Sequence, residues 1–318
     1  MSGTAAPNRL VVMAAYDPDG ELADHVRFQI EAWQGQCSRL LFVTTNPLTA
    51  AAREWLDGRA ELIERENVGY DFYSYRTGLL AAGDLAAYDQ VVICNDTYVG
   101  PLRSFAEIFA RMDGTAYDFW GITRSRRIKP HVQSFFVVFG RDCVASEAFT
   151  AFWTTMEPIS NRRKVIHRYE VGLSRTLKAS GFSFGSYYSE TRFEWRLARL
   201  RVLWWALRRQ NRPRGLRAGL AKLREWAREP WNPMAGLADA ALADARLPLV
   251  KIDTLRFDPY GLDAGRLLRH CAAAHPDAFA GLDAYFERTN SRYPPRPNEV
   301  LVPAPLPLRP LILLVRYR

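Results

Sequence analysis

The sequence predicts an α/β fold in which a mostly parallel sheet is covered by helices on both faces. Over residues 10–190, short apolar runs alternate with stretches of helical periodicity, which is the order of elements in parallel sheets. Runs such as LVVMAAY (10–16) are apolar throughout, as is typical of strands buried on both sides. The chain of 318 residues is 48% hydrophobic and 24% charged, a balance that allows a full-sized globular core.

The individual elements follow from this alternation. The predicted strands are 10–16, 40–45, 61–64, 90–95, 119–123, 134–140 and 182–187. The predicted helices are 21–33, 49–56, 71–82, 102–112, 143–156 and 169–180. Ligands of such sheets bind beyond the carboxyl ends of the strands, so polar residues that follow a strand are the first candidates for a functional site.

The rest of the chain divides into a basic segment, a second globular part and a tail. Apolar residues recur at steps of three and four over 216–228, which predicts an amphipathic basic helix; they are Leu216, Leu220, Leu223 and Ala227. A strand is predicted over 249–255 and helices over 265–274 and 278–288, while seven prolines after residue 292 predict an extended tail. We therefore expect a sheet domain over 1–190, a basic helical segment over 191–229, a helical part over 230–292 that packs on the sheet domain, and a Pro-rich tail over 293–318.

The net charge of the chain lies in the basic segment. Lysines and arginines number 43 against 34 acids, a formal charge of +9. Residues 191–229 hold twelve of these cations and three of the acids, so the rest of the chain is neutral. Because the cations alternate with Leu and Trp, the segment suits an anionic membrane surface better than nucleic acid. The alternative is an ordinary helical pair that packs on the core through its leucines and tryptophans.

Several classes of protein are disfavoured by what the sequence lacks. The four cysteines have no metal-ligand spacing and are predicted to be free thiols of a reducing compartment. The N-terminal MSGTAAPNRL has no signal-peptide pattern, and no apolar run reaches the length of about 18 residues that spans a bilayer. There is no GxGxxG, Walker, GxSxG or HExxH motif. We expect a cytoplasmic protein that is peripheral on the inner face of the cytoplasmic membrane.

The first two candidate sites follow predicted strands. The segment ENVGYDFYSYRTG (66–78) joins a strand to a helix, and its Asn67, Gly69 and Asp71 could face the base or ribose of a nucleotide. The alternative for Asp71 is a helix N-cap, a position that Asp favours. Asn95 and Asp96 end the strand QVVICN, where a carboxylate can hold Mg²⁺ or Mn²⁺ on a diphosphate. Their alternative is a plain turn.

The other two candidate sites lie later in the sheet domain. Glu170 is predicted in the first turn of a helix, where it could act as a general base on an acceptor hydroxyl. It could equally be placed there by the helix dipole. Four residues suit an acceptor pocket because they combine sugar-stacking rings with polar groups near two strands: Trp120, His131, Gln133 and Ser134.

Taken in order, these motifs resemble the rhamnan synthesis protein F family, bacterial glycosyltransferase-like proteins of cell-surface polysaccharide assembly. The matching pieces are ENVGYDFYSYRTGL, VVICNDTYVGPL, DFWGIT, HVQSFFVVF, YEVGLSRTLKASGF and PLVKIDTLRFDPYGL. With the strands before them they span residues 10–190 and 248–262. Their order is also similar to that of inverting family 2 glycosyltransferases of the GT-A fold, whose sheet is of the Rossmann type.

The resemblance implies a role for four of the candidate residues of the sheet domain. Asp96 falls on the metal-motif position, Glu170 on the catalytic-base position, and Asn67 and Asp71 in the nucleotide-side motif. The metal motif here reads Asn-Asp-Thr instead of Asp-x-Asp. With one carboxylate fewer, it predicts a weaker affinity for Mg²⁺ or Mn²⁺.

The activity implied by the resemblance is an inverting glycosyl transfer. This reaction needs one base and stabilisation of the leaving group but no enzyme nucleophile, so it is compatible with a sequence that has no nucleophile motif. The donor would be a nucleotide-sugar such as dTDP-rhamnose, and the acceptor a growing polysaccharide or a lipid-linked glycan. The alternative is a non-catalytic membrane-associated scaffold or sugar-binding protein that keeps a transferase-like fold. Neither function involves nucleic acid.

Overall fold

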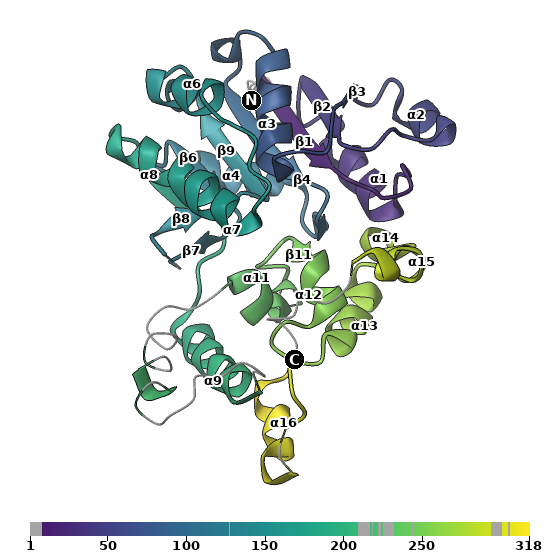
Figure 1. Ribbon diagram of the computed structural model, residues 1–318, viewed down its shortest axis with the longest axis vertical. Helices are drawn as coiled ribbons and strands as arrows, with labels where there is room; N and C mark the ends of the chain where they lie inside the picture. The colour runs from purple at the N-terminus through teal and green to yellow at the C-terminus, as the bar shows by residue number, and fades with distance from the viewer. Residues whose placement is uncertain are drawn as a thin grey trace, which may run out of the picture. The chain divides into compact units, whose positions relative to one another are not determined.

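A computed structural model describes residues 8–126, 128–208, 217, 219–221, 224, 232–242, 244–293, 301–304 and 306–318. The chain divides into two compact units, which are described one at a time (Figure 1). Unit 1 comprises Met1–Thr97, Arg103–Arg124 and Pro130–Tyr187. Unit 2 comprises Tyr98–Leu102, Ser125–Lys129 and Tyr188–Arg318.

Unit 1 is built on a seven-stranded sheet with the strand order β10-β6-β9-β4-β1-β2-β3. Its strands are β1 (Arg9–Ala15), β2 (Arg39–Thr44), β3 (Glu61–Glu64), β4 (Gln90–Asn95), β6 (Phe119–Gly121), β9 (Phe136–Gly140) and β10 (Phe184–Ser186). Every pairing is parallel except those of β9, which runs antiparallel to both β4 and β6. The mostly parallel sheet expected from the sequence is therefore confirmed.

Helices pack on both faces of this sheet, as predicted. On one face Phe72 stacks on Trp153, and both join the core cluster of Val12. On the other face Trp33 stacks on Phe105 with ring centroids 3.9 Å apart. The helices of the unit are α1 (Asp24–Trp33), α2 (Ala50–Leu56), α3 (Tyr70–Ala81), η1 (Leu85–Ala87), α4 (Phe105–Asp113), α5 (Arg141–Val144), α6 (Glu147–Thr154), α7 (Arg162–Val165), η2 (Ile166–Glu170) and α8 (Val171–Ala179). Two short strands, β7 (Arg124–Ser125) and β8 (His131–Val132), lie outside the main sheet.

Two predicted helices differ from the observed ones. The helix expected over 143–156 is two helices, because Ser146 caps a new one by accepting a hydrogen bond from the backbone N–H of Phe149 at 3.2 Å. The helix expected over 169–180 is entered through a π-helical turn, η2, and continues as α8. Single π-helical turns are frequent at functional sites, and this one ends on Glu170.

Unit 2 is mainly helical. Its elements are β5 (Tyr98–Val99), α9 (Arg192–Arg208), α11 (Pro233–Gly236), η3 (Ala238–Ala241), β11 (Val250–Lys251), α12 (Ile252–Phe257), α13 (Ala264–Ala274), α14 (Pro276–Phe279), α15 (Leu282–Thr289), η4 (Asn290–Arg292), η5 (Leu306–Leu311) and α16 (Ile312–Val315). The strand predicted over 249–255 was wrong beyond its first residues. Only β11 is extended, pairing antiparallel with β5, and α12 follows at once.

The end of the chain also differs from the prediction. Residues Leu306–Leu311 and Ile312–Val315 are short helices instead of an extended tail. The physical reason is packing, because Tyr317 is fully buried and its backbone N–H donates to the Leu262 carbonyl at 2.9 Å. The amphipathic helix predicted over 216–228 lies mostly outside the described residues. In the part of the chain that is described, no helix combines the length and the apolar character needed to cross a bilayer.

Candidate functional site

The candidate residues of unit 1 gather at the carboxyl edge of the sheet because one strand is reversed. β4 ends at Asn95, and the register of the β4–β9 pair sets Cys94 opposite Phe136. The segment 131–135, which precedes β9, therefore lies where β4 ends. This is the edge at which parallel α/β sheets bind ligands.

Asn95 links the end of β4 to the start of α3. Its Nδ2 donates to the Asp71 Oδ2 at 2.7 Å, and its Oδ1 accepts from the Thr97 hydroxyl, also at 2.7 Å. Asn95 is almost completely buried, whereas Asp71 is exposed. Asp71 makes no N-cap hydrogen bond, since the residue at the N-cap of α3 is Gly69. The two sequence motifs are thus joined by one side-chain contact, with the carboxylate on the solvent side.

Asp96 is held at the junction of β4 and β1. Its backbone N–H donates to the Ala14 carbonyl at 3.1 Å, and its Oδ2 accepts from the backbone N–H of Tyr16 at 2.8 Å. The side chain is half-buried. The carboxylate is therefore fixed just beyond two parallel strands.

Glu170 is oriented by two neighbours. Its Oε2 accepts from the Ser134 hydroxyl at 2.6 Å, and its Oε1 lies 3.2 Å from His131 Nε2. The His131 side chain is 4% exposed and the Glu170 side chain 20% exposed. The carboxylate is thus fixed in position while part of it still faces solvent.

A polar network connects the two ends of the site. The Tyr75 hydroxyl donates to the Ser134 carbonyl at 2.9 Å, and the Asn95 N–H donates to the Phe135 carbonyl at 3.2 Å. Segment 134–135 therefore has contacts with α3 and β4 on one side and with Glu170 on the other. Tyr75 was missed from the sequence, because a buried aromatic in an apolar helix face carries no signal of a polar role.

The loop before α3 is organised by Arg65, which sequence analysis also missed. The guanidinium donates to the carbonyls of Glu66, Val68 and Tyr70 at 2.6–2.8 Å and to Ser74 Oγ. Burial lowers the pKa of Arg65, and the nearby Asp71 carboxylate opposes this shift. The cation therefore folds the ENVGY backbone around itself.

Three further predicted residues lie outside this polar network. Trp120 is 4% exposed and packs against Phe109 and Phe136, so its ring lies in the core rather than at a surface that a sugar could stack on. Gln133 is half-buried and accepts the Thr123 hydroxyl at 2.7 Å. Asn67 is exposed in the loop.

The donor set at Asp96 is small for a metal site. Among the described residues, no group of three or more His, Cys, Asp or Glu side chains is placed to hold an ion. Sites for Mg²⁺ commonly use one or two carboxylates and complete the shell with substrate phosphates and water. Asp96 fits that kind of site and not one built from protein ligands alone.

This arrangement provides two separate chemical capabilities at one edge. An oriented, partly exposed carboxylate can take a proton from a hydroxyl within hydrogen-bonding reach. A second carboxylate at the strand ends can bind the polar or metal-bound part of a ligand. Both belong to unit 1.

Sequence comparison finds relatives that share part of the chain. A protein of Sinorhizobium fredii, the uncharacterised y4gN, is 27% identical over 186 residues, which cover 57% of this chain and 48% of y4gN. Virulence protein VirA of Vibrio anguillarum is 29% identical over 124 residues, or 37% of this chain and 39% of VirA. The chain thus spans about half of the first relative and less of the second.

Solved structures with a partly similar arrangement include two enzymes. A cytidylyltransferase from Leptospira borgpetersenii has 12% identity and a TM-score of 0.35, with 58% of this chain and 77% of that chain covered. Glucosyl-3-phosphoglycerate synthase from Mycobacterium tuberculosis, solved with Mn²⁺, UDP-glucose and phosphoglyceric acid, has 12% identity and a TM-score of 0.32, with coverages of 43% and 58%. Because both TM-scores are low, the fold is defined here by the strand order of the seven-stranded sheet and not by these two structures.

A family profile also matches the chain. The profile described as Rhamnan synthesis protein F matches residues 40–200, about half of the chain. The matched range includes Asp71, Asn95 and Asp96 on the one side of the polar network and Ser134 and Glu170 on the other. The chain belongs to the rhamnan synthesis protein F family.

Proposed function

We propose that the chain is a glycosyltransferase that moves a sugar from a nucleotide-sugar to a hydroxyl of a growing polysaccharide or lipid-linked glycan. The observation that carries the proposal is the setting of Glu170. Its carboxylate is held by Ser134 and His131, remains partly exposed, and shares one polar network with the end of β4. The family description, rhamnan synthesis, supports a role in polysaccharide assembly and dTDP-rhamnose as the donor.

In the proposed reaction, Glu170 takes the proton of the acceptor hydroxyl as its oxygen attacks the anomeric carbon. The new C–O bond forms on the face opposite the breaking bond to the diphosphate, so the anomeric centre inverts. The bonding electrons leave with the nucleoside diphosphate. Ser134 and His131 keep the accepting carboxylate in one orientation during the transfer.

On the donor side, Asp96 and Asp71 would contact the nucleotide-sugar, with Asn95 positioning Asp71 and Asn67 lying in the same loop region. Mg²⁺ or Mn²⁺ at Asp96 would take further ligands from the diphosphate and would stabilise charge on the leaving group. Arg65 adds a fixed cation beneath the loop.

The acceptor side involves the membrane in this proposal. A lipid-linked glycan would be met by a protein that is peripheral on the inner face of the cytoplasmic membrane. The cations and tryptophans of 191–229 suit an anionic lipid surface.

A pair of variants tests the proposal by separating the two carboxylates. Glu170→Gln is expected to lower transfer by about 10²–10⁴-fold, the usual contribution of a general base, and to bind the donor like the wild type. Asp96→Asn is expected to weaken donor binding, most clearly in the presence of Mn²⁺. A panel of nucleotide-sugars is screened by thermal shift with Mn²⁺ or with EDTA, and turnover of the best donor is measured by release of its nucleoside diphosphate.

The same measurements identify the alternative function. A wild-type protein that binds a donor without turning it over, and whose Glu170→Gln variant behaves identically, would be a sugar-binding or scaffold protein. Full turnover by Glu170→Gln would show that another group is the base.

A further inference from the structure

Large apolar side chains are left exposed on two elements of unit 2. On α9 Phe193, Leu200, Leu203 and Leu207 are exposed, and they recur at steps of seven, three and four, so they share one face of the helix. Trp195 is 36% exposed on the same helix and lies off this face. In the segment 306–314, Leu306 is 73% exposed, Leu313 63% and Leu314 67%. Soluble proteins rarely leave apolar residues exposed in such concentration without a partner for them.

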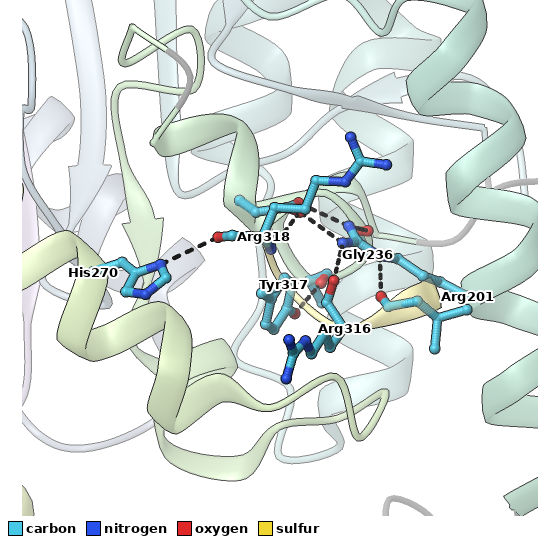
Figure 2. A network of polar contacts seen from close by, with 9 residues as sticks. Arg201, Gly236, His270, Arg316, Tyr317 and Arg318 are labelled. Atoms are coloured by element: carbon cyan, nitrogen blue, oxygen red, sulfur yellow. Dashed lines mark hydrogen bonds and ion pairs between the residues drawn. The ribbon is translucent and has the colours of Figure 1, made fainter. Parts of the chain in front are cut away.

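The two elements lie side by side within unit 2. The Val302 N–H donates to the Arg208 carbonyl at 2.7 Å, and Arg201 Nε donates to the Val315 carbonyl at 2.7 Å. Further along, the Arg318 guanidinium lies over the Phe193 ring at 4.8 Å. Val302 and residues 315–318 therefore contact α9 in antiparallel order, and Figure 2 shows Arg201 reaching the last residues of the chain.

The charges around these leucines are nearly all positive. Arg192 and Arg196 are exposed among the apolar residues of α9, and Arg309 and Arg318 are exposed in the terminal segment. From 300 to 318 the sequence contains no acid. Within α9 the single acid is Glu194, and its carboxylate is held by Arg246 at 2.7 Å. In the described parts of α9 and of 301–318, the exposed apolar side chains are thus accompanied by arginines, and the one acidic side chain, that of Glu194, is paired with Arg246.

Not every residue of the basic segment belongs to this face. Arg201 is fully buried and pairs with Asp239 through both carboxylate oxygens, at 2.6 and 2.7 Å. Trp204 is buried, and its indole N–H donates to the Gly261 carbonyl at 3.0 Å. These two side chains hold unit 2 together and are not available to a partner.

We propose that the exposed face of α9 and the segment 306–314 form one surface that binds an anionic lipid bilayer. This proposal rests on the membrane contact proposed above and adds to it a second segment, 306–314, which lies outside 191–229. Leucines and a phenylalanine enter the boundary between headgroups and acyl chains, while the arginines contact lipid phosphates. A bilayer fits better than a second copy of the chain, because two copies would bring the same cations together.

Vesicle binding by the full-length protein tests the proposal, with no nucleotide-sugar or acceptor present. Sedimentation is compared for vesicles of phosphatidylcholine alone and of phosphatidylcholine with phosphatidylglycerol. The wild type is expected to bind the anionic vesicles and to lose binding at high salt. The double variant Leu313→Glu/Leu314→Glu is expected to bind at least tenfold more weakly. Leu80→Glu is the matched control, since Leu80 is 47% exposed on α3 of unit 1 and should bind like the wild type.

Two outcomes would overturn the proposal. One is equal binding of the double variant and the wild type to anionic vesicles. The other is a wild-type dimer in sedimentation velocity that the double variant converts to monomer while vesicle binding stays unchanged, which would assign the surface to self-association. Glu170→Gln should bind vesicles normally, so loss of transfer in that variant is read separately from lipid binding.

Discussion

At the scale of single residues, Glu170 is contacted by two side chains from one short segment, which lies 36 to 39 positions earlier in the chain. Ser134 and His131 lie three positions apart in the segment before β9, and each reaches a different carboxylate oxygen. A carboxylate held from two sides keeps one orientation, which a proton acceptor needs more than it needs full exposure. Ser134 and His131 are therefore positioning residues in the proposed reaction.

Replacing Ser134 tests this role. Ser134→Ala is expected to lower kcat by about 10- to 100-fold, because a hydrogen bond to a charged group contributes about 1.5–3 kcal/mol. Donor binding should change little, since the Tyr75 contact is to the backbone carbonyl of Ser134 and remains. Ser134→Thr, which keeps the hydroxyl, should recover most of the rate. A wild-type rate for Ser134→Ala, measured under saturating donor, would remove Ser134 from the site.

The sequence anticipated part of this site and not its contacts. Polar residues after a predicted strand identified Asn95 and Asp96, because the rule that ligands bind at strand ends needs only the order of elements. Glu170 was identified by its predicted place in the first turn of a helix. It did not show that Ser134 and His131 bind Glu170, since that depends on the reversal of β9. Whether these residues carry out the proposed reaction stays a prediction.

Backbone contacts were harder to foresee. Arg65 and Tyr16 act through main-chain groups, Arg65 on carbonyls of the loop and Tyr16 by donating its N–H to Asp96. Every residue has a main-chain carbonyl, and every residue except proline has a main-chain N–H, so the sequence does not mark the ones that bind a side chain. Trp120 shows the opposite error, because an aromatic next to polar residues was expected at a ligand and is packed in the core.

At the scale of elements, the loop that leads into α3 depends on an unusual backbone. Gly69 has φ of +73° and Tyr70 has φ of +56°, so two consecutive residues are left-handed. A Cβ on Gly69 would lie 2.6 Å from the Tyr73 Cβ. The loop thus combines backbone strain with close packing at the point where Asp71 is presented.

Alanine substitutions at two glycines separate the effect of backbone strain from that of close packing. Gly69→Ala is expected to destabilise the protein by more than the roughly 1–2 kcal/mol of left-handed strain, because the new methyl group also meets Tyr73. Gly35→Ala has the same φ of +73° but nothing within 4 Å of its Cβ, so it should show the strain alone. Urea unfolding of both variants gives the two values. Equal losses of stability would mean that the loop relaxes around the clash.

Short apolar runs explain where the predicted elements failed. In 249–255, Val250 and Ile252 are spaced by two, as in a strand, whereas Leu249, Ile252 and Leu255 are spaced by three, as in a helix. The helix α12 begins at Ile252. The runs that form β1, β2 and β3 are each followed by a helix, as a parallel crossover requires, and there the predicted strands were correct. Local periodicity thus predicts whether a long segment is a helix or a strand, whereas for a short segment the outcome depends on packing.

At the scale of the molecule, the arginines of the basic segment have two different environments. Arg201 is buried in the interior of unit 2, where it also donates to the carbonyls of Gly236 and Arg316. Exposed arginines of the same helix remain at the surface. A count of charge along the sequence could locate the basic segment, but it could not tell the buried arginine from the exposed ones.

Removing the buried arginine should show how much it contributes. Arg201→Met is expected to cost about 3–5 kcal/mol, because it leaves the Asp239 carboxylate buried without its partner. Arg141→Met is the matched control, as Arg141 pairs with Asp89 at the surface and should cost at most about 1 kcal/mol. The double variant Arg201→Met/Asp239→Leu should regain part of the loss. Urea unfolding measures all three, and a loss for Arg201→Met no larger than for Arg141→Met would contradict the assignment.

The path of residues 302–318 along α9 also sets an order of events during synthesis. Arg201 takes partners from Val315 and Arg316, which lie 114 and 115 positions later in the chain. Every segment of unit 1 precedes Tyr188, so its sheet can form on the ribosome while α9 still lacks those partners. Until residues 315 and 316 are translated, the guanidinium of Arg201 on the nascent α9 lacks these two carbonyl partners. Unit 2 therefore closes later than unit 1, and mutations that slow its closure should affect yield in cells before they affect any property of the purified protein.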